Sequence, residues 1–396
     1  MASEPLRVCH IITRMIVGGA QQNTLYTMLD QQRRDGVEVS LITGPSGSGE
    51  GSLLPEMDRL GLKYHLIPQL VRRMSPLRDY IAYKRIARLL RSIGPDIVHT
   101  HTSKAGIVGR YAAARAHIRW IVHGNHGLPF NASNPAWKNW LFHALERRAA
   151  RLTDRFICVC ETMKDQALAA GLGEADQYDV VYSGMEIEPF LAAEAQRSAE
   201  RTRLQLTPDQ PVLIAIGRLI EHKGQQHIIG QLPALARALP GVRLLLVGGG
   251  PDEAKFKALA AQLGVADRCL WTGHVEPDRI PALLAAADLL AHCSVWEGLP
   301  RVAVQALLAH RPVVAYRADG IGEMVHDGVS GLLVAPGDDA ALAAGCIRLL
   351  GDPALRERFA QAGQDRCRKF YDWKVMGEQI HAIYHRMVDA YRREKS

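Results

Sequence analysis

Short runs of apolar, often β-branched residues alternate along the chain with longer stretches whose apolar positions recur at helical spacing. This pattern is typical of parallel sheets with crossover helices, so the expected fold class is α/β. The candidate strands of the first half are Leu6–Ile12, Val37–Thr43, Ile97–Thr100, Trp120–His123, Phe156–Val159 and Val180–Tyr182. Those of the second half are Val212–Ile216, Arg243–Val247, Cys269–Thr272, Leu289–His292, Val313–Tyr316 and Leu332–Val334.

The pattern restarts after a polar, alanine-rich stretch, Pro189–Gln205, which places a domain boundary between Ser183 and Glu194. A length of 396 residues also favours two domains with separate cores. We expect an N-terminal domain over 1–187, a C-terminal domain over 188–372, and a last amphipathic helix over 373–396 that packs back on the first domain. Two such halves predict a cleft between the carboxyl ends of their strands.

Composition indicates a folded protein, with 47% hydrophobic and 22% charged residues. The seven cysteines are scattered and none has zinc or thioredoxin spacing, which favours reduced thiols in the cytosol. Glu4, Arg7 and His10 interrupt the N-terminal apolar run, so it does not have a signal-peptide pattern. No uncharged apolar stretch reaches the length of a membrane span. The expected location is the cytoplasm, with peripheral association at the inner face of the cell membrane as an alternative.

One segment carries much of the net charge of +7. Its basic residues are Arg72, Arg73, Arg78, Lys84, Arg85, Arg88 and Arg91, against the single acid Asp79. Leu77, Ile81, Ile86, Leu89 and Leu90 lie between them at roughly helical spacing. The segment is either a solvated helix face or a contact for anionic lipid headgroups. Nucleic acid is excluded as the expected partner, because no RNA-stacking motif, zinc finger or basic coiled coil accompanies the charge.

A pair of glycines, Gly18 and Gly19, follows the first strand and precedes a helix expected to begin near Gln21. Adjacent glycines at such a turn let backbone N–H groups approach an anion at the helix N-terminus. A plain turn explains the pair equally well, and the spacing is not that of a nicotinamide-type fingerprint.

The second half begins with the same layout, since Arg218 and Lys223 follow the strand Val212–Ile216. Two cations at the carboxyl end of a strand can neutralise a diphosphate, or they can be ordinary surface residues. The run Gly248–Pro251 resembles a phosphate loop, but a tight turn that closes the strand is the favoured interpretation.

The most informative segment is Trp296–Leu307. Pro300 suits the first turn of a helix, which leaves Glu297 in the preceding loop and Gln305 on the second turn. The two polar side chains are then on the order of 10 Å apart, a separation that brackets a diphosphate with a sugar at each end. The alternative is a helix-start acid and an exposed polar residue.

These motifs occur in the order typical of family 4 glycosyltransferases. The second half contributes Gly217-Arg218-Leu219, Lys223-Gly224, Leu246–Pro251, Thr272–Val275, Glu297–Pro300 and Asp319–Glu323. The first half contributes Val98–Arg110 and Val122–Gly127, which look like the branch that builds bacterial surface polysaccharides. The whole chain resembles these retaining enzymes, and the resemblance implies a GT-B fold of two Rossmann-like domains facing each other across a cleft, with a C-terminal crossover helix.

The resemblance also implies site residues. By this resemblance, the donor diphosphate is bound by Gly18, Gly19, Arg218 and Lys223. The donor sugar or ribose is contacted by Gly298, Leu299 and Gln305. Glu297 matches the first acid of the E-x7-E motif beside the transferred sugar, and His126 matches the histidine that lies by that sugar on the N-terminal side. These two are the catalytic candidates.

One departure from the family pattern concerns Gln305, which stands where relatives carry the second acid of the motif. That carboxylate accepts hydrogen bonds from both ribose hydroxyls, whereas an amide accepts with its oxygen only. We therefore expect a weaker ribose contact. Gly322 also replaces the proline that many relatives carry before the acid equivalent to Glu323.

The resulting hypothesis is a retaining glycosyltransferase that moves a hexose or N-acetylhexosamine from a nucleotide diphosphate sugar, UDP-linked, to a hydroxyl of a lipid-linked or surface-polysaccharide precursor. No cofactor or metal is expected, because the sequence holds no Asp-x-Asp run and Arg218 with Lys223 supply the charge. The alternatives are a sugar-nucleotide epimerase of the same fold and a sugar-nucleotide-binding protein with weak catalysis.

Overall fold

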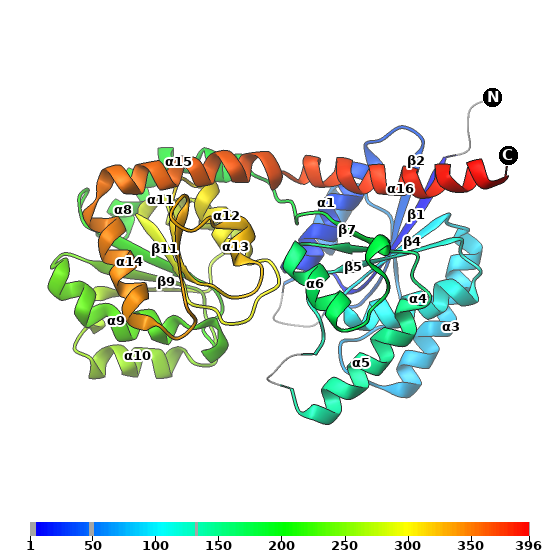
Figure 1. The fold of residues 1–396 in the computed structure, drawn as a ribbon, viewed down its shortest axis with the longest axis horizontal. Helices are drawn as coiled ribbons and strands as arrows, with labels where there is room; N and C mark the ends of the chain where they lie inside the picture. The colour runs from blue at the N-terminus through cyan, green and yellow to red at the C-terminus, as the bar shows by residue number, and fades with distance from the viewer. Residues whose placement is uncertain (1–4, 47–50, 131–133, 396) are drawn as a thin grey trace. The chain divides into compact units, whose positions relative to one another are not determined.

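The computed structural model describes residues 5–46, 51–130 and 134–395 (Figure 1). The chain divides into two compact units. Unit 1 comprises residues 1–185 together with 373–396, and unit 2 comprises residues 186–372. The sequence suggested boundaries at 187/188 and 372/373, so the observed first boundary lies slightly earlier.

Unit 1 is built around a parallel sheet of seven strands in the order β3-β2-β1-β4-β5-β6-β7. The strands are β1 (Leu6–Arg14), β2 (Val37–Gly44), β3 (Tyr64–Leu66), β4 (Ile97–His101), β5 (Trp120–Asn125), β6 (Arg155–Cys158) and β7 (Tyr178–Val180). The sheet order changes direction between β1 and β4, because the chain first builds outward to β3 and then returns to the other side of β1.

Helices cover both faces of this sheet. They are α1 (Gly19–Gln32), α2 (Leu54–Arg59), α3 (Pro76–Ile93), α4 (Ser103–Arg115), α5 (Ala136–Ala150), α6 (Glu161–Ala169), α16 (Trp373–Lys395) and the short 3-10 helix η1 (Ala175–Gln177). On one face, α3 and α4 pack on alternate residues of the central strands. On the other face lie α1 and α16, which run side by side (Figure 1).

The C-terminal helix α16 therefore belongs to the core of unit 1. Its buried side chains are Trp373, Met376, Ile380, Ile383, Tyr384 and Met387, and they pack with Val8, Ile97 and Val122 of the sheet. The approach to α1 is close, since a Cβ at Gly377 would lie 2.2 Å from the carboxyl carbon of Asp30. In the part of the chain that the structure describes, every helix is too short or too polar to traverse a bilayer.

Unit 2 repeats the architecture with six parallel strands in the order β10-β9-β8-β11-β12-β13. The strands are β8 (Val212–Ile216), β9 (Arg243–Val247), β10 (Cys269–Gly273), β11 (Leu289–His292), β12 (Val313–Tyr316) and β13 (Gly331–Val334). The helices are α7 (Glu188–Leu191), α8 (Arg197–Arg203), α9 (Gln225–Ala238), α10 (Glu253–Gln262), α11 (Ile280–Ala286), α12 (Arg301–Leu308), α13 (Ile321–Met324), α14 (Asp339–Gly351) and α15 (Pro353–Phe370). Four 3-10 turns are η2 (Ala193–Gln196), η3 (Glu221–Lys223), η4 (Ala266–Arg268) and η5 (Pro277–Arg279).

The α/β class and the two parallel sheets expected from the sequence are confirmed, with small corrections. The strand β3 was not expected, because three residues at a sheet edge carry too little pattern. The expected strand Val180–Tyr182 lies two residues earlier, at Tyr178–Val180. Helix α1 begins at Gly19 rather than near Gln21, so the two glycines are its N-cap and its first residue. All seven cysteines are free and buried.

Candidate functional site

The sheet of unit 2 changes direction between β8 and β11, and the loops that leave these two strands meet there. Open α/β sheets bind ligands at such a point, outside the carboxyl ends of the strands. Lys223, after β8, forms an ion pair with the Glu297 carboxylate, after β11. The two side chains are 26% and 20% exposed, so the pair remains accessible to a ligand. Lys223 and Glu297, assigned from the sequence to diphosphate and sugar respectively, are thus direct neighbours.

Asp319 positions Glu297, and His292 lies close to it. Its backbone N–H donates to Oδ2 of Asp319 over 2.6 Å. Asp319 has a φ of 44°, in the left-handed region that Asp tolerates better than most residues. At the end of β11, Nε2 of buried His292 lies 3.8 Å from Oε1 of Glu297. Burial lowers the pKa of His292, with Glu297 acting in the opposite direction, so the imidazole is neutral near pH 7.

Arg218 lies on the same loop as Lys223, but its side chain is exposed. Within the described residues its guanidinium forms no ion pair. The backbone of the loop is held by Gln225, whose Nε2 donates to the carbonyl of Arg218 over 3.2 Å. Gly224 has a φ of 78°, and a Cβ there would lie 2.1 Å from the carbonyl oxygen of Cys293. Only glycine therefore lets the β8 and β11 loops approach each other this closely.

The glycine run Gly248–Pro251 packs against this same loop. A Cβ at Gly248 would lie 2.2 Å from the carbonyl oxygen of Gly217, and one at Gly250 would lie 2.2 Å from that of Leu219. This close approach of two backbones favours the tight-turn interpretation of the run.

The remaining donor-site candidates lie on and before α12. Gly298 and Leu299 are half-buried in the loop, and Pro300 is the N-cap residue, so the helix begins at Arg301 rather than at the proline. Gln305 lies on the second turn of α12, as the sequence indicated, and its side chain is half-buried.

In unit 1 the sheet changes direction between β1 and β4, and a cavity of about 610 Å³ opens at their carboxyl ends. Its apolar lining comes from Ile16, Met74, Ile107, Val108, Pro129, Phe142 and Leu145. Its polar and charged lining comes from Thr13, Arg14, Gln21, Arg72, Asp79, Thr102, Ser103 and Lys104. Nζ of Lys104 lies 2.5 Å from Oδ1 of Asp79. The cavity combines cations with a hydrocarbon-like wall.

Gly18 and Gly19 lie at the N-terminus of α1, beside this cavity, to which Gln21 of the same turn contributes. The φ of Gly18 is −176°, an extended conformation that any residue adopts. A Cβ there would meet only the flexible Gln21 side chain. Backbone conformation therefore does not explain the glycine at position 18, whereas close approach of a ligand to the helix N-terminus would.

His126 follows β5 and is half-buried. Its Nε2 lies 3.0 Å from Nδ1 of His101, which in turn belongs to a cluster with His10 and His99. Ligand nitrogens of His10, His99 and His101 all lie within 4.8 Å of one another, which makes them the candidate metal group of the described residues. However, Nδ1 of His10 and Nε2 of His101 are 2.9 Å apart, the separation of a direct hydrogen bond.

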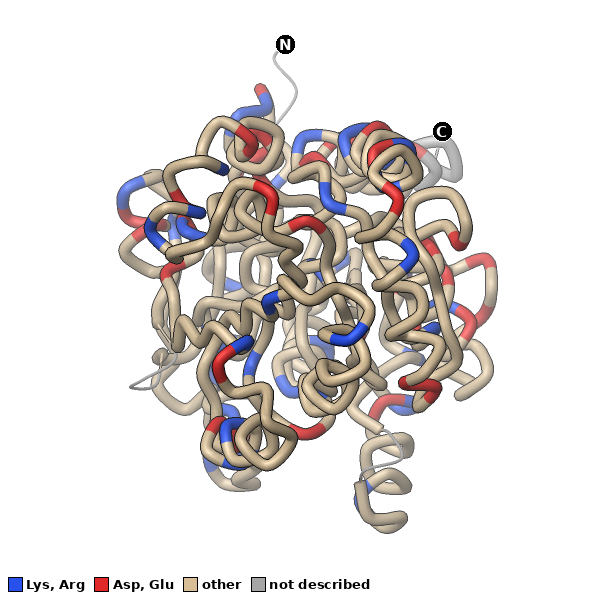
Figure 2. The backbone as a smooth tube through the Cα atoms, turned by 90° about the vertical axis from the view of Figure 1, so that its left-hand side faces the viewer, with Lys and Arg blue, Asp and Glu red and all other residues tan. Residues whose placement is uncertain are grey.

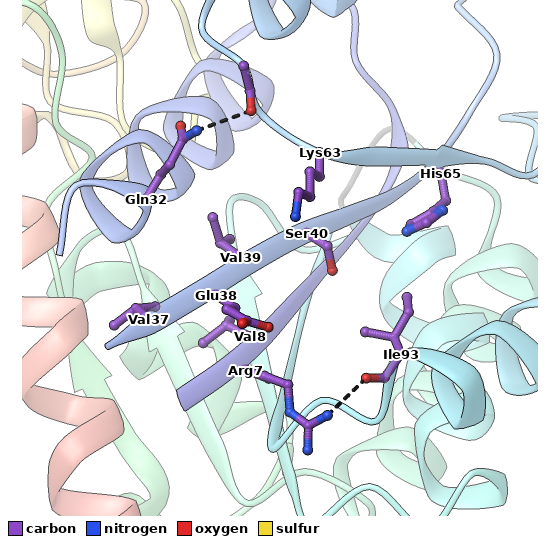
Figure 3. A pocket seen from close by; sticks show the side chains of 11 residues that line it. Arg7, Val8, Gln32, Val37, Glu38, Val39, Ser40, Lys63, His65 and Ile93 are labelled. Atoms are coloured by element: carbon purple, nitrogen blue, oxygen red, sulfur yellow. Dashed lines mark hydrogen bonds between the residues drawn. The ribbon is translucent and has the colours of Figure 1, made fainter. Parts of the chain in front are cut away.

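A second cavity of unit 1, of about 360 Å³, lies at the opposite end of the sheet (Figure 3). It is lined by the first residues of β1 and β2, among them Arg7 and Glu38, and by Lys63 and His65. The Arg7 guanidinium there donates to the carbonyl of Ile93 over 3.4 Å. Since ligands of such sheets bind at the carboxyl ends of the strands, we assign the functional site to the larger cavity.

The basic segment named from the sequence forms α3 and the residues before it. Its seven cations are all exposed. Ile86 and Leu90 are buried as expected, but Leu77 is 71% exposed, because the first turn of α3 extends beyond the core. Elsewhere acidic and basic residues are interspersed along the chain in the view of Figure 2.

Sequence reasoning missed the residues that support the site. Asp319 lies within a motif that was recognised, but its bond to Glu297 joins residues far apart in the chain. The histidines at positions 10, 99 and 101 occupy inward-facing strand positions, where an apolar residue is the ordinary choice. Polar residues at inward-facing positions of two neighbouring strands are the sequence signal from which these histidines could have been identified.

Comparison with known proteins agrees with both units. The family described as "Glycosyl transferase 4-like domain" matches residues 18–184, and "Glycosyl transferases group 1" matches residues 196–366. The chain is 31% identical over 276 residues to the GDP-mannose-dependent alpha-(1-6)-phosphatidylinositol monomannoside mannosyltransferase of Mycolicibacterium smegmatis, covering 68% of this chain and 70% of that protein. It is 25% identical over 358 residues to the Escherichia coli UDP-Gal:alpha-D-GlcNAc-diphosphoundecaprenol alpha-1,3-galactosyltransferase, covering 88% and 89% of the two chains.

Among solved structures, the Anabaena protein Alr3699/HepE in complex with UDP superimposes with a TM-score of 0.81 at 24% identity, covering 96% of this chain and 100% of that one. This likeness concerns the fold, which is the GT-B arrangement that the motif order implied. With both units matched by glycosyltransferase families, the chain belongs to the family 4 glycosyltransferases of GT-B fold.

Proposed function

We propose that this glycosyltransferase moves a hexose or N-acetylhexosamine from a UDP-sugar to a hydroxyl of a lipid-linked saccharide, with retention of anomeric configuration and without a metal. The observation that carries the proposal is the Lys223–Glu297 pair at the switch point of unit 2, flanked by exposed Arg218. It provides cations for a leaving diphosphate and a carboxylate for the sugar within one small site.

In this proposal Arg218 and Lys223 bind the diphosphate, and the N-terminus of α1 at Gly18 and Gly19 adds backbone N–H groups. Glu297 and His126 lie by the transferred sugar, Gly298 and Leu299 contact the donor, and Gln305 binds the ribose. Because Lys223 is already paired with Glu297, a diphosphate must compete for it, whereas Arg218 meets the ligand without that competition.

The cavity of unit 1 is proposed as the acceptor site. Arg14, Arg72 and Lys104 can bind the phosphate of a lipid-linked saccharide, and the apolar wall can contact its hydrocarbon chain. The Escherichia coli relative is named for a diphosphoundecaprenol-linked acceptor and the Mycolicibacterium relative for a phosphatidylinositol mannoside, which supports a lipid acceptor here. The UDP-linked donor is supported by the first of these names and by the UDP complex of the Anabaena protein.

Exposed apolar side chains around that cavity support peripheral binding to an anionic membrane. Met74, Leu77 and Tyr80 are 54%, 71% and 53% exposed at the start of α3, among the basic residues Arg72–Arg91. Trp137 and Trp140 are 68% and 73% exposed on the first turns of α5, the helix whose Phe142 and Leu145 line the cavity. In Figure 1 α3, α4 and α5 lie together on one side of unit 1. Tryptophan beside basic residues is typical of surfaces that contact headgroups.

Donor binding is tested by calorimetry with UDP and a panel of UDP- and GDP-sugars. Arg218→Ala is expected to weaken UDP binding at least about tenfold, the loss of one charge-assisted hydrogen bond of roughly 1.5–3 kcal/mol, and Lys223→Ala less. Arg237→Ala, which removes another exposed arginine from the same unit, is the matched control. Unchanged UDP binding in both site variants would contradict the diphosphate site.

Transfer is then measured with lipid-linked saccharide acceptors, where Glu297→Gln should lower kcat far more than it changes donor KM. Donor turnover without any acceptor would instead indicate an epimerase, and tight donor binding without turnover a binding protein. For the membrane, co-sedimentation with phosphatidylglycerol vesicles should fall when Arg85 and Arg88 are replaced or salt is raised, each cation adding up to about 1 kcal/mol. Binding insensitive to both changes would leave the basic face merely solvated.

A further inference from the structure

The inward-facing histidines of unit 1 are not used by the proposed reaction, although one of them contacts His126. His10 on β1 pairs in register with His99 on β4, and His101 lies two residues further along the same face of the sheet. All three are at most 1% exposed. Helices α1 and α16 cover this face, so the cluster lies between the sheet and the two helices.

The contacts between these side chains form a continuous relay of hydrogen bonds. Oε1 of Gln31, on α1, lies 2.8 Å from Nε2 of His10. Nδ1 of His10 lies 2.9 Å from Nε2 of His101, and Nδ1 of His101 lies 3.0 Å from Nε2 of His126. The backbone leaves room for the rings at Gly124, where a Cβ would lie within 3.2 Å of nitrogens of His99, His101 and His126. Three side chains, those of Gln31, His10 and His101, thus connect helix α1 to His126.

The two buried histidines of the relay, His10 and His101, are neutral near pH 7. Burial lowers the pKa of His10 to about 4, against a smaller raising effect of the hydrogen bond to Gln31. Burial likewise lowers the pKa of His101 well below its ordinary value, and neighbouring histidines lower it further. A neutral imidazole has one donor and one acceptor nitrogen, so each contact fixes the roles in the next.

The side chain of Gln31 sets which nitrogen donates and which accepts in each hydrogen bond of this relay. Its carbonyl oxygen can only accept, so Nε2 of His10 carries the proton and Nδ1 of His10 accepts from His101. His101 then donates through Nε2 and accepts through Nδ1, which requires the proton of His126 to be on Nε2. If the amide of Gln31 were reversed, every ring in the chain would change its tautomer.

Tyr384 on α16 lies next to this group. Burial raises the pKa of Tyr384, and the neighbouring Gln31 side chain acts against this. The Tyr384 hydroxyl lies 2.7 Å from Nδ1 of His99. Nε2 of Gln31 has no hydrogen-bond partner within the described residues, so the amide is held through Oε1 and His10 alone.

We propose that Gln31, His10 and His101 are positioning residues that fix His126 as the Nε2-protonated tautomer and so set the hydrogen bonding of this side chain toward the transferred sugar. The inference rests on the role given to His126 in the proposed function. It assigns to helix α1 and to three buried residues a part in sugar recognition, through a relay of hydrogen bonds that ends at the site.

The test is nitrogen NMR of the full chain with 15N-labelled histidine at pH 7, with His126→Gln used to assign the His126 signals. The parent is expected to show His126 protonated at Nε2. Gln31→Met removes the acceptor at nearly constant length, so both directions of the chain become populated and kcat should fall about two- to tenfold while donor KM changes less than about twofold. Gln32→Met is the matched control, because Gln32 is exposed and donates to the carbonyl of Gly61 outside the relay.

An Nδ1-protonated His126 in the parent, or a Gln31→Met variant with unchanged tautomer and kcat, would overturn the proposal. Tyr384→Phe gives a second readout if Gln31→Met fails to fold, since it should alter the tautomer of His99 while His126 stays protonated at Nε2. The tautomers are measured without donor or acceptor. Absence of sugar transfer by the parent would therefore contradict the proposed function, and the spectra would still decide the relay.

Discussion

Acidification should destabilise unit 1 through its buried histidines. Burial lowers the pKa of His10 to about 4, and it lowers those of His99, His101 and His123 well below their ordinary value. In the unfolded chain each ring regains an ordinary pKa near 6.5. The unfolded state therefore binds more protons than the folded state below pH 6.5, and folding stability is lost as the pH falls through this window.

The size of the effect follows from His10. The difference between a pKa of 6.5 in the unfolded state and about 4 in the folded state corresponds to a loss of about 3 kcal/mol of folding stability once His10 is protonated in both states. About 2 kcal/mol of this loss is reached at pH 5. The three other buried histidines act in the same direction, because burial and the charges of their neighbours lower their pKa values. A domain of ordinary stability, about 5–15 kcal/mol, would lose a large part of it.

The assay is urea unfolding at pH 7, 6 and 5, followed by tryptophan fluorescence and circular dichroism. The free energy of unfolding should fall steeply between pH 6.5 and 5. His10→Gln, which retains a hydrogen-bonding side chain without titrating, should flatten the slope, and His274→Gln, at an exposed position of unit 2, should not. Equal slopes in the parent and in His10→Gln would refute the reasoning.

Three other outcomes are expected. Glu146→Gln leaves the fully buried Arg110 guanidinium without its counter-charge, so urea unfolding should show a loss of about 3–5 kcal/mol. Gln305→Glu should retain transfer activity and tighten donor binding in calorimetry by about 1 kcal/mol, since a charged acceptor replaces a neutral one. Gly224→Ala places a Cβ 2.1 Å from the Cys293 carbonyl oxygen at a φ of 78°, so it should weaken UDP binding by separating the two loops, and unchanged binding would contradict the loop geometry.

The fold was largely predictable because its signal is local. Apolar β-rich runs such as Val212–Ile216 and Leu289–His292 are buried on both faces of a parallel sheet, and their bounds agree with the structure. Errors occurred where burial is incomplete. The edge strand Tyr64–Leu66 has only three residues, and the exposed Leu77 belongs to a turn of α3 outside the core, although its spacing fits the apolar face.

The candidate site was predictable only as separate motifs. Lys223 and Glu297 were identified from the sequence, but their contact depends on β8 and β11 being neighbours in the sheet, which spacing along the chain does not reveal. The support that Asp319 gives to Glu297 depends on a backbone conformation with positive φ. Long-range pairs of this kind follow from topology and not from periodicity.

The ion pair between Lys223 and Glu297 affects the net charge that the candidate site presents to a ligand. Arg218, Lys223 and Glu297 together carry a single positive charge, and in the ligand-free chain Lys223 is neutralised by Glu297. In the proposed function, a diphosphate that binds Lys223 draws its ammonium group away from Glu297, and the carboxylate is then available to the sugar. Because residue 305 is an amide, it adds no further carboxylate to those of Glu297 and Asp319. Under the proposed function, the amide at Gln305 makes a weaker ribose contact but keeps the surroundings of the diphosphate more cationic, so this departure from the family pattern is compatible with an active enzyme.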